Sequence, residues 1–164
     1  MFIKSFVEKL QTAMYVPENE ILKQGEDGQG LFFVSNGDCI VNVRDQSGYD
    51  HNLLRLLVQG DHFGEITSIY RCKTSATVIS RNYNIMAFIS VDRLRELTID
   101  FPNYLWVLKK HLFKYKDPRI NFLKAMIKKI FYMKDMNKEE IHEILYNMTE
   151  EIHLEGELIM RDNN

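Results

Sequence analysis

Several features that mark common protein classes are scarce or missing in this sequence. Its 164 residues include two cysteines, three prolines and one tryptophan. The two cysteines, Cys39 and Cys72, provide neither a disulfide framework nor the spacing of a metal site. No apolar run reaches the roughly 18 residues that span a bilayer, and no signal-peptide pattern opens the chain. We therefore expect a domain exposed to the cytosol.

The chain also lacks a large excess of charge of either sign. Its formal net charge is −2 and its pI is about 6.2. A nucleic-acid partner is not expected, because the basic footprint of such proteins is missing. Hydrophobic residues make up 45% and charged residues 27%, which is typical of a globular protein. The length suits one domain, or one domain with part of another.

The pattern of apolar residues divides the chain into a β-rich part and helical parts. Residues 5–13 fit one helical face, which we expect Pro17 to end. Short apolar runs separated by turn residues then predict strands, and Asn36-Gly37 predicts a hairpin between two of them. The predicted strands lie near residues 21–24, 31–34, 39–43, 53–58, 76–79 and 85–89. We therefore expect an α+β protein with an antiparallel β-roll, similar to a jelly roll, and flanking helices.

After residue 89 the apolar period changes from two to 3.6 residues. Ser90 or Asp92 is predicted to cap a helix, Pro102 to begin another, and Asn137 to open the last one as a capping box. The helical pattern between these points runs from Phe122 to Met133.

Residues 144–159 resemble residues 6–22, at an offset of about 138 residues. We interpret residues 1–117 as one module and residues 118–164 as a helical linker and the start of a second, incomplete repeat. The alternative is that similar helical patterns recur by chance.

The run Gly60-Asp61-His62-Phe63-Gly64-Glu65-Ile66, followed by Thr74-Ser75-Ala76-Thr77-Val78, carries most of the functional signal. It joins a glycine-marked turn and an acidic residue to a cluster of small hydroxylated residues. Such a carboxylate can hold a sugar hydroxyl, and backbone amides in turns and at helix starts can bind phosphate.

This run, together with Pro17–Glu26 and Leu31-Phe32-Phe33-Val34-Ser35-Asn36-Gly37, resembles the cyclic nucleotide-binding domain family. The resemblance covers residues 5–116 and implies a regulatory site for cAMP or cGMP, with no other cofactor and no metal. The residues that it implies for the ligand site are Phe63, Gly64, Glu65, Ile66, Lys73, Thr74, Ser75, Ala76 and Thr77.

Each half of this implied site has its own task. By resemblance, Glu65 accepts a hydrogen bond from a ribose hydroxyl, and the backbone of Gly64 and Ile66 lies close to the sugar. Ser75 and Ala76 donate to the cyclic phosphate, and Thr77 lies near the phosphate or the base. A C-terminal helix closes over the base in the family. Leu112 and Tyr115 are the candidates for that lid, and packing on the roll is the simpler interpretation of both.

The sequence departs from the family at Thr74. Binding members carry an arginine there, nine residues after the motif glutamate. Threonine cannot make the forked, charge-assisted pair of a guanidinium with phosphate. Losing one partner of a buried charge pair costs about 2–5 kcal/mol, which weakens binding by about 30- to 3000-fold. Lys73 and Arg71 are the neighbouring cations that could take over this role.

Three functions stay open at this point. The first is a ligand-gated regulatory module. The runs Ser90-Val91-Asp92 and Asp100-Phe101-Pro102 resemble the helices that follow the roll in the cation-channel branch of the family. This resemblance implies the cytoplasmic domain of a cyclic-nucleotide-regulated cation channel in a membrane. Its partners would be the rest of a larger channel or regulatory protein, with homo-oligomerisation as a further expectation. The second is a degenerate domain of the same fold that serves assembly, or part of a protein kinase regulatory subunit.

The third function is an enzyme on a β-roll, which we do not expect. His51 and His62 form no metal-ligand pattern. The glycines of Gly25-x-x-Gly28-x-Gly30 precede a strand rather than a helix, so we interpret them as a turn and not as a dinucleotide loop.

Overall fold

The computed structural model describes residues 2–44, 50–111, 118–148 and 153–160. Eight strands form two four-stranded antiparallel sheets, with the orders β1-β8-β3-β6 and β2-β7-β4-β5. The strands are β1 (Gln11–Tyr15), β2 (Glu20–Leu22), β3 (Gly30–Asn36), β4 (Cys39–Arg44), β5 (Asp50–Leu57), β6 (His62–Phe63), β7 (Thr77–Ser80) and β8 (Asn84–Ser90).

The strand pairs are nested, as in one long hairpin that has been rolled up. The first strand pairs with the eighth, the second with the seventh, the third with the sixth and the fourth with the fifth. Cross pairs of β3 with β8 and of β4 with β7 complete the two sheets. The predicted antiparallel β-roll with flanking helices is therefore confirmed, and every predicted strand overlaps an observed one.

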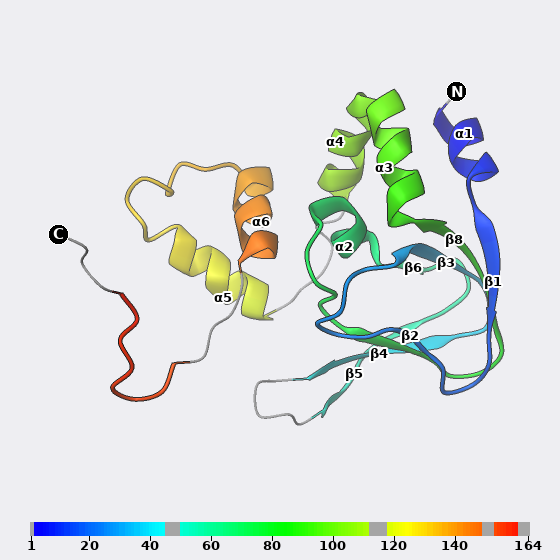
Figure 1. The fold of residues 1–164 in the computed structure, drawn as a ribbon, viewed down its shortest axis with the longest axis horizontal. Coiled ribbons are helices and arrows are strands. Elements are labelled where there is room, and N and C mark those ends of the chain that lie inside the picture. The colour runs from blue at the N-terminus through cyan, green and yellow to red at the C-terminus, as the bar shows by residue number, and fades with distance from the viewer. Residues whose placement is uncertain (1, 45–49, 112–117, 149–152, 161–164) are drawn as a thin grey trace.

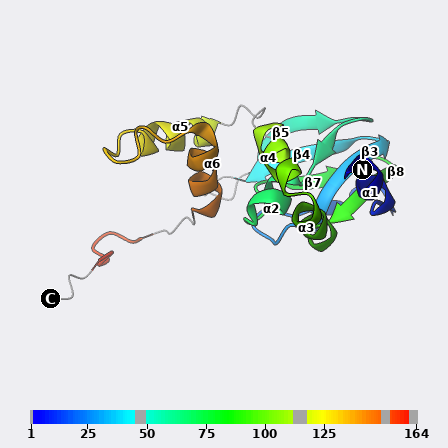
Figure 2. The ribbon, with the colours of Figure 1, turned by 90° about the horizontal axis from the view of Figure 1, so that it is seen from above.

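Six helices flank the roll in the described residues. Figure 1 shows α1, α3 and α4 at one end of the roll, and α5 and α6 lying to its side beyond α2. Figure 2 shows the same separation of the α5–α6 pair from the roll. The helices are α1 (Phe2–Glu8), α2 (Glu65–Tyr70), α3 (Val91–Asp100), α4 (Pro102–His111), α5 (Pro118–Ile127) and α6 (Lys138–Asn147).

Helix ends follow local chemistry at two predicted positions. The Ser90 side chain caps α3 by accepting from the Arg93 backbone N–H. Asn137 and Glu140 form the capping box at the start of α6. Of the two predicted caps for α3, Ser90 is therefore the one used.

Three sequence predictions about local structure are wrong. The predicted helix at residues 5–13 ends at Glu8, and β1 follows because its backbone pairs with β8. Pro17 therefore does not end the helix. The helix predicted through Met133 ends at Ile127, and turns follow.

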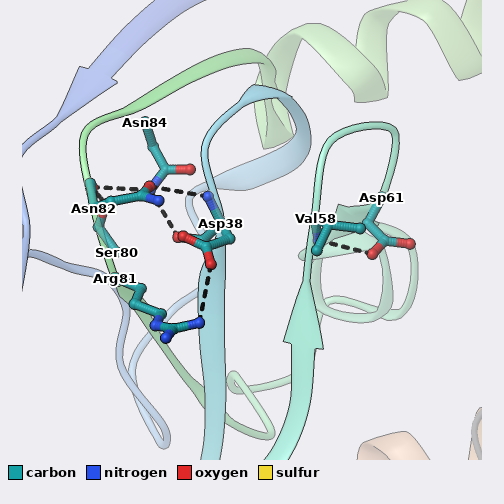
Figure 3. A network of polar contacts seen from close by, with 7 residues as sticks. All are labelled: Asp38, Val58, Asp61, Ser80, Arg81, Asn82 and Asn84. Carbon is teal, nitrogen blue, oxygen red and sulfur yellow. Dashed lines mark hydrogen bonds and ion pairs between the residues drawn. The ribbon is translucent and has the colours of Figure 1, made fainter.

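Asn36-Gly37 forms a turn, but it does not form a hairpin, because β3 and β4 belong to different sheets. The reason lies in the polar network of Figure 3, where Asn84 is 1% exposed and donates to the backbone carbonyl of Asp38 at 2.8 Å and to Ser80 Oγ at 2.7 Å. Arg81 pairs with Asp38 at 3.2 Å. A side chain at Gly37, where φ is +92°, would lie 2.3 Å from Asn84 Oδ1. The turn is thus bound to the β7–β8 turn, which also connects the two sheets.

Three apolar clusters stabilise this arrangement. The first fills the roll, where Phe32 stacks on Phe63 with ring centroids 5.1 Å apart. The second joins the roll to α1, α3 and α4 through buried Ile89, Leu94 and Leu97. The third lies between α5 and α6 and is separate from the other two. The third cluster is the physical basis for describing the α5–α6 pair as a unit of its own.

The described elements test two parts of the predicted second repeat, its helix and its first strand. A helix is present at both copies, α1 and α6. Within the described residues 153–160 no strand is assigned, although the repeat would place one near residues 158–160. The division at residue 117 remains a prediction.

Candidate functional site

The turn between β5 and β6 directs the chain into the candidate site. Gly60 has a φ of +91°, and Asp61 accepts from the Val58 backbone N–H at 2.9 Å (Figure 3). The other carboxylate oxygen of Asp61 accepts from Arg55 at 3.0 Å. The Asp61 carboxylate therefore fixes the turn and is not available as a ligand group. We call residues 63–77, which follow this turn, the cassette.

The first half of the cassette is built around Gly64 and Glu65. Gly64 has a φ of +80°, and a Cβ there would lie 2.3 Å from the backbone oxygen of Gly30. Only glycine allows this approach of the cassette to the roll. Glu65, the first residue of α2, is 3% exposed, and its Oε2 atom has no hydrogen-bond partner among the described residues. We call Gly64 and Glu65, with the start of α2, the ribose half.

An unpartnered buried carboxylate oxygen requires an explanation, because buried polar atoms are nearly always hydrogen-bonded. A ligand hydroxyl would supply the missing donor. Glu65 is therefore buried at the start of α2, and its role as an acceptor for a sugar hydroxyl stays a prediction.

The α2 helix is held by its own hydroxyl groups and by a glycine of the roll. Thr67 and Ser68 donate to the backbone oxygen of Gly64 at 3.1 and 2.7 Å. A Cβ at Gly28 would lie 2.1 Å from Thr67 Oγ1. Gly28 thus allows the loop after β2 to lie directly against the cassette helix.

The second half of the cassette is built around Thr74. Its backbone N–H donates to Glu26 and its carbonyl accepts from Gly25, both at 2.8 Å. The side chain is 6% exposed, and Oγ1 has no hydrogen-bond partner among the described residues. The position expected for the family arginine is therefore buried, neutral and polar. We call Thr74 and its neighbours Lys73 and Ser75 the phosphate half.

The two cations next to Thr74 are directed elsewhere. Lys73 Nζ lies 2.6 Å from Asp27 Oδ1, and both side chains are exposed. Arg71 is in the left-handed region with φ +57° and lines a cavity of about 50 Å³ with Ser68, Leu94 and Arg95. This cavity lies between α2 and α3. Neither predicted replacement for the arginine is therefore placed in the buried part of the cassette.

The remaining predicted site residues divide into structural and accessible positions. Phe63 is buried in the roll, and Thr77 accepts from the Gln24 backbone N–H at 3.1 Å. Ser75 is exposed, whereas Ile66 and Ala76 are half-buried. Ser75 and Ala76 are therefore the members of the second half that a ligand can reach most easily.

Sequence reasoning missed the loop at residues 24–28 as part of the site. Its residues pair with the cassette through Gly25, Glu26, Asp27 and Gly28. The glycine spacing in this loop was a signal, but it predicted only a turn. The lid candidates Leu112 and Tyr115 lie outside the described residues.

The C-terminal end of α2 contacts α6. The rings of Tyr70 and Tyr146 lie 4.7 Å apart, and His142 contacts Tyr146 edge-on at 5.9 Å. Burial raises the pKa of Tyr70 to about 12, with a further contribution from Glu143 and Glu139 of α6. The cassette helix is thus in direct contact with the α5–α6 pair.

Few other reactive groups occur in the described part of the chain. Burial raises the pKa of both thiols, that of Cys39 to about 11, so both are protonated near neutral pH. No cluster of three potential metal-ligating side chains occurs among the described residues. None of the described helices combines the length and apolarity needed to cross a membrane.

Comparison with known proteins gives a consistent set of relatives. The cyclic nucleotide-binding domain family matches residues 14–100. The human potassium/sodium hyperpolarization-activated cyclic nucleotide-gated channel 4 is 27% identical over 101 residues, covering 62% of this chain and 8% of the channel. The regulatory subunit of cAMP-dependent protein kinase from Debaryomyces hansenii is 32% identical over 80 residues, covering 49% of this chain and 17% of that protein.

Among solved structures, the C-linker and CNBHD of zELK channels, crystallised in the presence of cAMP, is similar to this fold. The TM-score is 0.59 at 25% identity, covering 70% of this chain and 58% of the other. The chain spans only a small part of the curated relatives that it matches.

Proposed function

Because this chain belongs to the cyclic nucleotide-binding domain family, we propose that it is a regulatory module that binds cAMP or cGMP at the cassette. The observation that carries the proposal is the buried Glu65 carboxylate oxygen without a partner, next to the left-handed Gly64. A ribose hydroxyl that donates to Glu65 would satisfy this atom.

The phosphate half contributes less to binding in this proposal. Ser75 and Ala76 would face the phosphate with hydroxyl and backbone amide groups. No guanidinium stands at Thr74 to pair with it. We therefore expect an affinity well below that of an arginine-containing site, in the micromolar range or weaker.

Binding at the cassette would be transmitted through the helices that touch α2. The described contacts of α2 include α3, α4 and α6. A ligand that is held better in one arrangement of α2 shifts the population of these helices toward that arrangement. The similarity to the channels and to the zELK domain supports a cytoplasmic channel domain as the context.

A second function is favoured by specific observations. Thr74 is neutral, and Lys73 is paired with Asp27, so the phosphate half lacks a buried cation among the described residues. A domain that keeps the fold but serves assembly or interdomain contact would have this appearance. The similarity to a kinase regulatory subunit gives that context as the alternative to a channel.

Titration calorimetry with cAMP and cGMP separates these functions. Binding with micromolar affinity that is lost in Glu65→Ala supports the regulatory module. Gln11→Ala, at an exposed position in β1, is a suitable control for the substitution itself. If no ribose-containing ligand binds at millimolar concentration, the assembly role replaces the proposal.

A further inference from the structure

The basic side chains around the cassette lie at the surface. Lys73 pairs with Asp27 at 2.6 Å, and Lys23 pairs with Glu26 at 3.1 Å. Arg71 lies on the α3 side of α2, where it lines the small cavity described above. Among the described residues, no cation is therefore placed in the buried part of the site.

The buried part of the site instead offers two neutral or acceptor groups in need of partners. Glu65 Oε2 and Thr74 Oγ1 are both buried and both without a hydrogen-bond partner among the described residues. A hydroxyl group can donate to the first and can donate to or accept from the second. A phosphate diester has no donor and brings a negative charge, whose burial is costly without a paired cation.

We infer that this site binds an uncharged ribonucleoside at least as tightly as the corresponding cyclic nucleotide. The inference rests on the proposed function, because it uses the same ribose contact to Glu65. In a nucleoside the 3′- and 5′-hydroxyls are free, and they occupy the region where the cyclic phosphate would lie. These hydroxyls can bond Thr74 at no cost in buried charge.

The size of the effect follows from the missing pair. An arginine at residue 74 would favour a cyclic nucleotide by about 30- to 3000-fold, whereas a nucleoside would gain nothing from that charge. Without the arginine, this preference disappears. We expect adenosine or guanosine to bind at least as tightly as cAMP or cGMP, respectively.

The experiment is titration calorimetry of the whole chain with adenosine, guanosine, cAMP and cGMP at two ionic strengths. The expected result is a nucleoside Kd equal to or below that of the matching cyclic nucleotide, with no salt dependence. Thr74→Arg should tighten the cyclic nucleotide by at least 30-fold and change the nucleoside Kd by less than threefold. Lys4→Gln, in α1, is the control, because it removes an exposed charge outside the cassette, and it should leave both Kd values unchanged.

Other outcomes overturn the inference in distinguishable ways. A wild-type chain that binds cAMP or cGMP tenfold more tightly than the matching nucleoside agrees with the proposed function and contradicts the inference about nucleosides. A chain that binds none of the four ligands at millimolar concentration contradicts both. If Thr74→Arg does not fold, as judged by circular dichroism, the ratio of the wild-type Kd values and their salt dependence decide alone.

Discussion

The two halves of the cassette differ in how they are attached to the roll and in what they offer a ligand. In the ribose half, Gly64 lies against the backbone of Gly30, and the Glu65 carboxyl is buried beside it. In the phosphate half, Thr74 is attached through backbone hydrogen bonds to an exposed loop, and its cationic neighbour Lys73 is paired at the surface. One half therefore holds a buried carboxylate against the roll, whereas the other half has no buried cation among the described residues.

The largest expected effect concerns the attachment of the ribose half. Gly64→Ala should lower the free energy of unfolding by about 3 kcal/mol, because it adds left-handed strain to a contact 2.3 Å from the Gly30 oxygen. Gly25→Ala is the matched control, in the loop that pairs with Thr74, where φ is +85° but no atom lies within 4 Å. That variant should lose only about 1 kcal/mol in urea denaturation. Equal losses would mean that the close approach at Gly64 contributes nothing.

A second effect concerns His142, which contacts Tyr146 within α6, and Tyr146 in turn contacts Tyr70 at the C-terminal end of α2. Burial, followed by the nearby Lys124, lowers the pKa of His142 to about 4, and Lys138 acts in the same direction while Glu139 opposes it. A folded pKa below the ordinary 6.5 means that stability is present above pH 6.5 and is lost as pH falls toward 4. The loss is at most about 1.4 kcal/mol per pH unit, or about 2 kcal/mol between pH 6.5 and pH 5.

Amide hydrogen exchange at pH 7 and pH 5 measures this effect by residue. Protection should fall in α6 and at Tyr70, and it should stay unchanged at Glu65 beyond the ordinary pH dependence of exchange. His142→Gln should abolish the difference, whereas His62→Gln, at an exposed position, should not. Equal loss of protection at both ends of α2 would show that α6 does not distinguish the two halves.

A third effect concerns the ring contact between α2 and α6. Tyr146→Ala should weaken the docking of α6 by about 1 kcal/mol, because it removes an aromatic pair 4.7 Å apart. Tyr132→Ala is the control, since that ring is 78% exposed and precedes α6 in the chain. Thermal unfolding should distinguish the two variants. If both variants unfold at the same temperature, the contact between Tyr70 and Tyr146 does not contribute to stability.

Much of the fold could be predicted because its signals are local. Alternating apolar residues and turn residues located the strands, and Ser90 and Asn137 marked two helix starts. The errors arose where distant partners decide the structure. Residues 11–13 belong to the predicted helical segment but pair with β8 some 70 residues later. The turn at Asn36-Gly37 leads into the other sheet, where Asp38 accepts from the distant Asn84.

The same reasoning applies to the candidate site. The order of residues in the cassette predicted that Glu65 and Thr74 belong to one site, and the structure places both in buried positions. The partner loop could not be predicted, because Asp27 and Lys73 are 46 residues apart in sequence. No local pattern indicated that Lys73 would be directed to Asp27 and not toward Thr74.

The smallest expected effect tests whether Lys73 can replace the missing arginine. Asp27→Asn removes the partner of Lys73, and we expect cAMP binding to tighten by threefold or less. The reason is that both side chains are exposed, and exposed ion pairs contribute about 0–1 kcal/mol, so Lys73 is already nearly free to move. Glu26→Gln, which removes the partner of Lys23, is the matched control. Calorimetry at low ionic strength makes the effect largest, because screening is weakest there. Tightening of tenfold or more in Asp27→Asn alone would show that Lys73 reaches the ligand phosphate. The pairing of Lys73 with Asp27, and not the neutral Thr74, would then limit the affinity for the cyclic nucleotide.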